Sequence, residues 1–178
     1  MTLIITHSGQ TGVERGADRA ARMIDIPVEG ICAFEGRDEI ASLPPEIAAD
    51  LRPCPRKGAR QALTATLTVS NALVIAVPNA EAANTVIGIE PLRRFARAKG
   101  IPLWIVDPIS NLDEVAREAR RLAGHRDTLR VMITGPRSTR WRDGERFGFR
   151  VVGTLADVAA PDVTYERSSS RSMLEPGL

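Results

Sequence analysis

The sequence predicts one three-layer α/β/α domain, in which helices cover both faces of a mostly parallel sheet. Short apolar runs rich in β-branched residues alternate with segments whose apolar residues recur at helical spacing. This alternation is typical of parallel strands joined by crossover helices. The chain has 178 residues, of which 43% are hydrophobic, which suits a single domain with a sizeable core. We place the domain at residues 1–164 and expect a polar, flexible tail at 165–178.

Five segments have the composition of buried parallel strands, which are short and apolar because helices cover both of their faces. A sixth strand at the sheet edge is expected at Phe149–Gly153. The five main strands are expected at Leu3–Thr6, Val28–Ile31, Ala72–Val77, Leu103–Val106 and Leu129–Ile133.

Helices are expected between these strands. The first starts near Val13, because apolar residues follow it at offsets of 4, 7, 8 and 11. Asn111 is a candidate N-cap for a later helix that Gly124 would end. The proline-rich stretch between residues 32 and 56 is expected to form a long loop. The other expected helices are Ala59–Val69, Glu90–Lys99 and, within the long loop, Pro45–Leu51.

A candidate anion site lies between the first strand and the first helix, in the loop Ser8–Gly12. A strand, a glycine-rich turn and a helix start together present backbone N–H groups and a positive helix dipole to an anion. Glycines at 9, 12 and 16 match neither a Walker A loop nor the G-x-G-x-x-G dinucleotide pattern. The alternative is a plain turn that uses glycine for its backbone freedom.

Polar residues follow the other strands too, and ligands of open α/β sheets bind at the carboxyl ends of the strands. The loop amides are expected to hold a phosphate, two arginines to neutralise it, and Asn79, Asn84 and Thr85 to contact a sugar or base. The full candidate set is Ser8, Gly9, Gln10, Thr11, Gly12, Arg15, Gly36, Arg37, Asn79, Asn84, Thr85, Gly135, Pro136, Arg137 and Ser138.

Two further residues near the loop have two interpretations each. Glu14 is the best candidate for a catalytic acid, but it also suits compensation of the helix dipole in the first turn. His7 could act as a base or a ligand contact, or it could be a structural residue at the end of its strand. Whether the protein is an enzyme therefore stays open at this stage.

Composition argues against several partners. The formal net charge is only +2, so we expect no general attraction to nucleic acid or to a membrane surface. The two cysteines and two histidines lack metal-ligand spacing, so no metal site is expected. No apolar run approaches the roughly 20 residues of a membrane helix, and Met1 leads directly into a strand. We therefore expect a cytoplasmic protein.

Three blocks of the chain resemble one known family. S-G-Q-T-G-V-E-R at 8–15 is similar to the G-G-Q-T-G-V-D-R signature of the molybdenum cofactor carrier-like proteins. Gly36-Arg37 with residues 30–32, and L-R-V-M-I-T-G-P-R-S at 129–138, resemble that family's second and third motifs. The family is the circularly permuted YpsA-like branch of the SLOG superfamily of Rossmann-like nucleotide-binding domains. Ser8 and Glu14 replace the family's glycine and aspartate.

The resemblance implies a Rossmann-like fold and the binding of a phosphate-bearing small molecule, either a nucleotide or molybdenum cofactor (molybdopterin), by a carrier or a sensor. Phosphoribohydrolase relatives imply an alternative, hydrolysis of a nucleotide N-glycosidic bond. Relatives such as the DNA-processing protein DprA imply a second alternative, the binding of single-stranded nucleic acid through residues 137–142. The low net charge of the chain disfavours this alternative. Members commonly form dimers or tetramers, so a homo-oligomer is expected.

Overall fold

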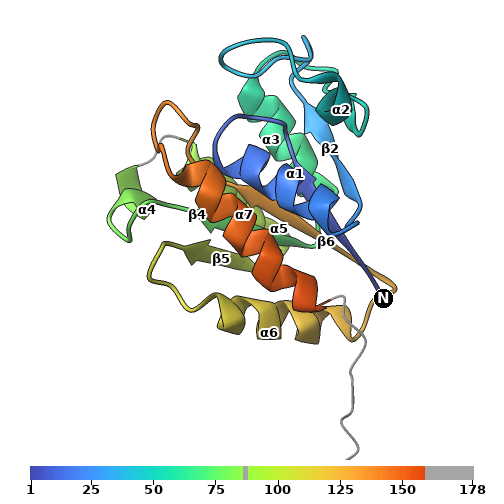
Figure 1. Cartoon of the computed structure of the whole chain (residues 1–178), viewed down its shortest axis with the longest axis vertical. Helices are drawn as coiled ribbons and strands as arrows, with labels where there is room; N and C mark the ends of the chain where they lie inside the picture. Colours follow the sequence, from blue (N-terminus) through green and yellow to red (C-terminus); the bar gives the residue numbers. More distant parts are fainter. Residues whose placement is uncertain (86–87, 159–178) are drawn as a thin grey trace, which may run out of the picture.

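Six parallel strands form one sheet in the computed structural model, which describes residues 1–85 and 88–158 (Figure 1). Their order across the sheet is β3-β2-β1-β6-β4-β5, so the last strand along the chain lies near the middle. This arrangement confirms the predicted α/β class and its largely parallel sheet. The strands are β1 (Thr2–His7), β2 (Val28–Cys32), β3 (Leu51–Pro53), β4 (Ala72–Ala76), β5 (Leu103–Val106) and β6 (Thr128–Thr134).

Helices cover both faces of this sheet. On the face turned to the viewer in Figure 1 lie α1 (Val13–Met23), α6 (Leu112–Ala123) and α7 (Gly144–Leu155). The opposite face carries α3 (Ala59–Thr68) and α5 (Ile89–Lys99). The remaining helices are short: α2 (Pro45–Ala48), α4 (Ala82–Thr85) and the 3₁₀ helix η1 (Ala156–Val158).

Two predictions about the elements are wrong. Phe149–Gly153 is not an edge strand but lies within α7, whose Phe147, Val151 and Val152 are buried at helical spacing. The edge strand is instead β3, inside the stretch predicted to be a loop, so the helix predicted to reach Leu51 ends at Ala48. Pro53 is compatible with a strand here because an edge strand has one unpaired side. The tail at 165–178 lies outside the described residues.

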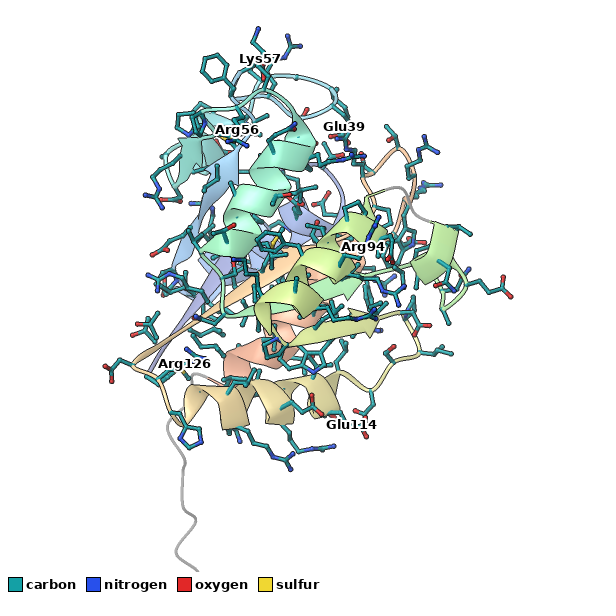
Figure 2. All side chains as sticks on the ribbon, turned by 180° about the vertical axis from the view of Figure 1, so that it is seen from behind. Glu39, Arg56, Lys57, Arg94, Glu114 and Arg126 are labelled. Carbon is teal, nitrogen blue, oxygen red and sulfur yellow. The ribbon has the colours of Figure 1, made fainter. Side chains whose placement is uncertain are left out.

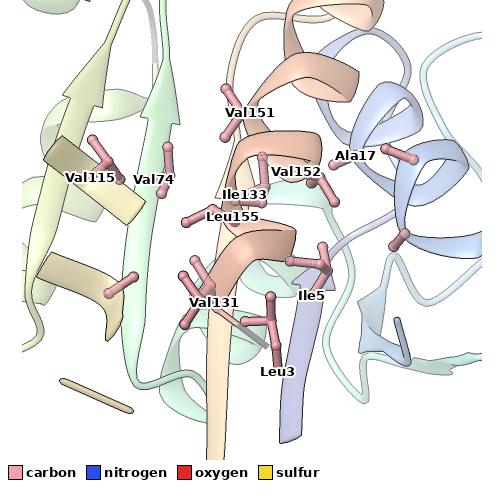
Figure 3. Packing of buried hydrophobic residues seen from close by; sticks show 14 of the residues in the cluster. Leu3, Ile5, Ala17, Val74, Val115, Val131, Ile133, Val151, Val152 and Leu155 are labelled. Atoms are coloured by element: carbon pink, nitrogen blue, oxygen red, sulfur yellow. The ribbon is translucent and has the colours of Figure 1, made fainter. Parts of the chain in front are cut away.

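Alternation along the central strands builds a core on each side of the sheet. Val131 and Ile133 of β6 face α7 and α1, whereas Met132 between them faces α3 and α5. Successive side chains of a strand point to opposite faces, so β6 contributes to both layers. Figure 3 shows Val151, Val152 and Leu155 of α7 packed against Ile133 and Val131 of β6. The buried sheet therefore fixes the positions of the loops at its carboxyl edge.

The predicted capping of α6 is confirmed. The Asn111 side chain accepts a hydrogen bond from the backbone N–H of Asp113, at 3.2 Å. That bond satisfies one of the amides left free at the start of a helix. Gly124 follows the last helical residue, Ala123, as the sequence predicted.

Candidate functional site

The loops after β1, β2 and β6 meet at the carboxyl edge of the sheet, where α/β domains bind ligands. Direct contacts join two of them. The backbone N–H and the hydroxyl of Ser138, after β6, both donate to Thr11 Oγ1, after β1, at 3.1 and 2.9 Å. Two sequence motifs that are more than a hundred residues apart thus form one surface.

The concave side of the Ser8–Gly12 loop holds a carboxylate of the chain itself. Glu14 Oε2 accepts hydrogen bonds from the backbone N–H of Ser8 at 2.9 Å, from the Ser8 hydroxyl at 2.9 Å and from the N–H of Gln10 at 3.0 Å. Thr134 Oγ1 donates to the other oxygen, Oε1, at 2.8 Å. The residue is 1% exposed. The amides of Ser8 and Gln10 in the loop therefore hold a carboxylate of the same chain, and binding of an external anion by the loop stays a prediction.

The glycines around this loop allow segments of the chain to approach one another. A Cβ added to Gly12, where φ is +76°, would lie 2.6 Å from the carbonyl oxygen of Pro136. A Cβ on Gly16 would overlap the carbonyl of Glu145 in α7. Gly12 thus allows the loop to pack closely against residues 136–138, and Gly16 allows α1 to pack closely against α7. The glycine spacing that predicted an anion site therefore has a structural role.

His7 supports the loop from beneath. Its ring is fully buried, and Nδ1 accepts the backbone N–H of Gly9 at 3.0 Å. Nε2 must therefore carry the proton, and it donates to Asp18 Oδ1 at 3.1 Å. Burial raises the pKa of Asp18, but hydrogen bonds from His7 and Arg22 outweigh that effect and lower it below the ordinary 3.8. These contacts match the structural interpretation of His7.

Arg15 joins the loop to the segment after β2. Its Nε donates to the carbonyl of Gly9 at 3.1 Å, and Nη2 lies 2.7 Å from Asp38 Oδ2. The other oxygen of Asp38 accepts the backbone N–H groups of Ile40 and Ala41, at 2.7 and 2.8 Å. Arg15 therefore fixes a tight turn, and that turn presents the residue between Asp38 and Ile40, which is Glu39.

A cavity of about 290 Å³ lies where these loops meet the N-terminal end of α3. Figure 2 shows the labelled Glu39 near the end of α3 where Lys57 lies. The cavity mixes two arginines, three acidic residues and one amide. Its lining residues are Gln10, Ala33, Glu35, Arg37, Asp38, Glu39, Gly58, Ala59 and Arg137.

Two side chains in this cavity have buried polar atoms without a hydrogen-bond partner among the described residues. Gln10 is 4% exposed, and neither its amide nitrogen nor its amide oxygen is paired. Glu39 Oε1 accepts from the Thr11 hydroxyl, but Oε2 is unpaired, and the Glu39 side chain is only 10% exposed. Arg137 Nε lies 3.9 Å from Oε2, which is an ion-pair distance but is too long for a hydrogen bond. Leaving such groups unpaired costs about 1–3 kcal/mol each.

The structure brings some predicted site residues to the cavity and places others elsewhere. Gln10, Arg37 and Arg137 line it directly, while Ser8, Gly9 and Gly12 belong to its supporting loop, to which Arg15 of α1 donates a hydrogen bond. Gly36 has a φ of +60° and allows the turn after β2, and Gly135 and Pro136 back the loop. Asn79, Asn84 and Thr85 do not line it: the Asn79 side chain accepts the N–H of Ala82 at 2.9 Å, and Asn84 and Thr85 are exposed on α4.

Sequence reasoning missed Glu39 and the α3 end of the cavity. Gly58, with a φ of +103°, directly precedes the helix that was predicted from Ala59. A glycine before a helix start is the signal that could have identified this side of the cavity. Glu39 sits in an irregular turn and has no periodic signal. Glu14, the candidate acid, does not line the cavity.

A second, larger cavity of about 900 Å³ borders α7. Trp141, which belongs to the segment 137–142 considered for single-strand binding, lines it and packs on Phe147 with ring centroids 5.4 Å apart. Within residues 1–85 and 88–158, no group of three histidine, cysteine or acidic side chains could hold a metal ion. Across the same residues, every helix is too short or too polar to span a membrane.

The parallel sheet with helices on both faces defines a Rossmann-like α/β domain, and a solved structure has the same fold. The crystal structure of the "Putative molybdenum carrier protein" from Syntrophus aciditrophicus is similar with a TM-score of 0.71 and 19% identity, covering 87% of this chain and 94% of that chain.

The chain belongs to the circularly permutated YpsA SLOG family, whose model matches residues 5–155. A search of curated proteins finds no match to the chain. The predicted family is thus confirmed, and membership supports nucleotide or cofactor binding at the level of the family.

Proposed function

We propose that the protein binds a phosphate-bearing small molecule, a nucleotide or a pterin-type cofactor, in the cavity between the Ser8–Gly12 loop and α3. The observation that carries this proposal is the buried, unpaired amide of Gln10. Buried polar groups in native proteins nearly always have partners. A ligand that supplied hydrogen bonds to this amide would remove the cost of leaving it unpaired.

The donors for a phosphate lie at the mouth of the cavity. Arg37 and Arg137 line it, and guanidinium groups bind phosphate bidentately. α3 begins at Ala59 without a side-chain cap, so the first amides of the helix face the same space with a favourable dipole. Because Glu14 occupies the amides of Ser8 and Gln10, we place the phosphate at the arginines and α3 rather than on those two amides.

The family and the solved neighbour support the same ligand class. That neighbour carries the name of a molybdenum carrier, and molybdenum cofactor is a pterin phosphate. A cavity with phosphate donors at its mouth and unpaired polar groups inside suits such a molecule as well as a nucleotide. Two of the acids in the cavity are engaged by the protein itself, Asp38 by Arg15 and Glu39 Oε1 by Thr11, so we propose binding rather than hydrolysis. Holding a ligand intact suits a carrier or a sensor.

Thermal unfolding with added ligands tests the proposal. Inorganic phosphate, nucleoside monophosphates and a pterin phosphate are added separately, and the melting temperature is recorded. A ligand at 100 times its Kd stabilises the native state by about 2.7 kcal/mol, which corresponds to a shift of roughly 5–10 °C for a domain of this size.

Arg37→Gln and Arg137→Gln should reduce the shift. Arg126→Gln is the matched control, because Arg126 is exposed and Figure 2 shows it at the opposite end of the molecule from Glu39. The absence of a shift across the whole panel contradicts the proposal.

A further inference from the structure

The unpaired groups inside the cavity define what kind of ligand edge would fit them. A carboxylate only accepts hydrogen bonds, whereas an amide both donates and accepts. Glu39 Oε2 and the Gln10 side chain line the same space, and both are at least nine-tenths buried. A complementary ligand therefore presents donors to Glu39, and an acceptor or a donor to Gln10.

Glu39 is held so that one oxygen stays free. Thr11 donates to Oε1 and itself accepts from the N–H and hydroxyl of Ser138, so the position of Thr11 is fixed from both sides. The turn that carries Glu39 is fixed by the pair of Arg15 and Asp38. With Oε1 committed to this network, Oε2 is left facing the cavity. A purely structural role of Glu39 accounts for the first oxygen but not for the second.

We propose that this cavity recognises the 2-amino-4-oxopyrimidine edge, in which a ring N–H lies next to an exocyclic amino group. The inference rests on the proposed binding of a phosphate-bearing ligand and specifies its ring. Guanine and pterins share this edge. Both donors would point at the free oxygen of Glu39, Oε2, and the Gln10 amide would donate to the neighbouring carbonyl oxygen. Adenine presents a ring nitrogen acceptor beside its amino group, and that acceptor would face the carboxylate unfavourably.

The size and charge of the cavity agree with this assignment. A volume of about 290 Å³ lies at the lower limit of small-molecule pockets, which begin near roughly 300 Å³. It therefore suits one ring system with its phosphate outside, next to Arg37 and Arg137. Arg137 does not neutralise Glu39 by a direct hydrogen bond, because their closest atoms are 3.9 Å apart and 41% of the arginine side chain is exposed.

The affinities of three nucleotides test whether the cavity recognises the 2-amino-4-oxopyrimidine edge, and this test needs no mutation. Guanosine, inosine and adenosine monophosphate are titrated into the protein by calorimetry. Inosine monophosphate lacks only the 2-amino group, so it should bind about 10- to 100-fold more weakly than guanosine monophosphate, the range expected for a hydrogen bond to a charged group. Neopterin phosphate forms a second arm, and its affinity relative to guanosine monophosphate shows which source of the shared edge the cavity prefers.

Glu39→Gln supplies the matched variant. The amide oxygen can still accept from Thr11, so only the atom at Oε2 changes, from an acceptor to a donor. The preference for guanosine over inosine monophosphate should disappear, whereas Glu81→Gln, at an exposed position, should retain it. A melting curve of each variant without ligand shows that it is folded.

The outcomes separate the two proposals. If all three nucleotides bind the unmodified protein equally, the assignment of the edge is wrong while ligand binding stands. If neither the nucleotides nor neopterin phosphate binds, the proposed function fails. A guanine preference that survives Glu39→Gln also overturns the role given to Glu39. If the pterin binds and the nucleotides do not, the shared edge is supported with the pterin as its source.

Discussion

Thr134 and Glu14 form a hydrogen bond of 2.8 Å between two buried side chains, one at the end of β6 and the other in the first turn of α1. With three further donors on its other oxygen, the Glu14 carboxylate closes the loop that the sequence predicted to be an anion site. The favourable field at the start of α1 is thus used to bury an acid of the same chain. This arrangement makes the residue a determinant of stability.

Replacement of Glu14 should therefore act on folding. Glu14→Gln should lower the free energy of unfolding by about 1–3 kcal/mol, because bonds to a charged acceptor become bonds to a neutral one. Glu14→Ala should cost more, since it leaves the donors of Ser8, Gln10 and Thr134 unpaired. Urea unfolding measures both. A purely catalytic Glu14 would leave the stability unchanged, and that result would contradict the structural role.

The regular elements could be predicted because their signals are local. Apolar runs such as the one at 72–77 and helical spacing such as the one after Val13 correspond to β4 and α1 within one or two residues. α7 was missed because its glycines disfavour a helix, and the adjacent Val151 and Val152 favour a strand. Close contact with α1, which needs Gly148, outweighs that propensity.

The candidate site was predictable only in part. The loops could be placed at one sheet edge because parallel strands end together. Glu14 contacts Ser8 and Gln10 locally, but the sequence could not show that Thr134, 120 residues away, binds the other oxygen of this buried carboxylate. Nor could it show that Asn79 turns its side chain to the backbone of its own loop, at Ala82. The bond from Thr134 depends on long-range packing, whereas Asn79 makes a local contact three residues apart that competes with a ligand.

The bridge from Arg15 to Gly9 and Asp38 should control the shape of the cavity. Arg15→Lys keeps the charge but cannot make both contacts, which use two different guanidinium nitrogens. We expect a loss of about 1 kcal/mol in the free energy of unfolding, together with a several-fold weaker binding of the best ligand. Arg19→Lys is the control, because it lies on the same helix, is 58% exposed and pairs with Glu145. Equal effects of both variants would exclude a specific role of the bridge.

Acid should weaken the fold through Asp18. Its pKa is lower in the folded protein than the ordinary 3.8, so the unfolded state binds the proton more tightly. The contribution of Asp18 to stability is complete above the unfolded pKa and is lost as the pH falls through the folded one, at pH values below about 4. Asp18→Asn should flatten the dependence of the urea midpoint on pH in this window. Asp127→Asn, on an exposed residue, should not.

Two glycines of α7 should respond in opposite directions to the same substitution. A Cβ on Gly148 would overlap the carbonyl of Val13, where α7 crosses α1, so Gly148→Ala should separate the helices. We expect a loss of about 3 kcal/mol or more, as in overpacked cores. Gly153 has no atom within 4 Å of an added Cβ, so Gly153→Ala should gain roughly 0.5–1 kcal/mol from helix propensity. Thermal and urea unfolding of the two variants distinguish packing from propensity. If Gly148→Ala were neutral or stabilising, Gly148 would have no role in the packing of α7 against α1.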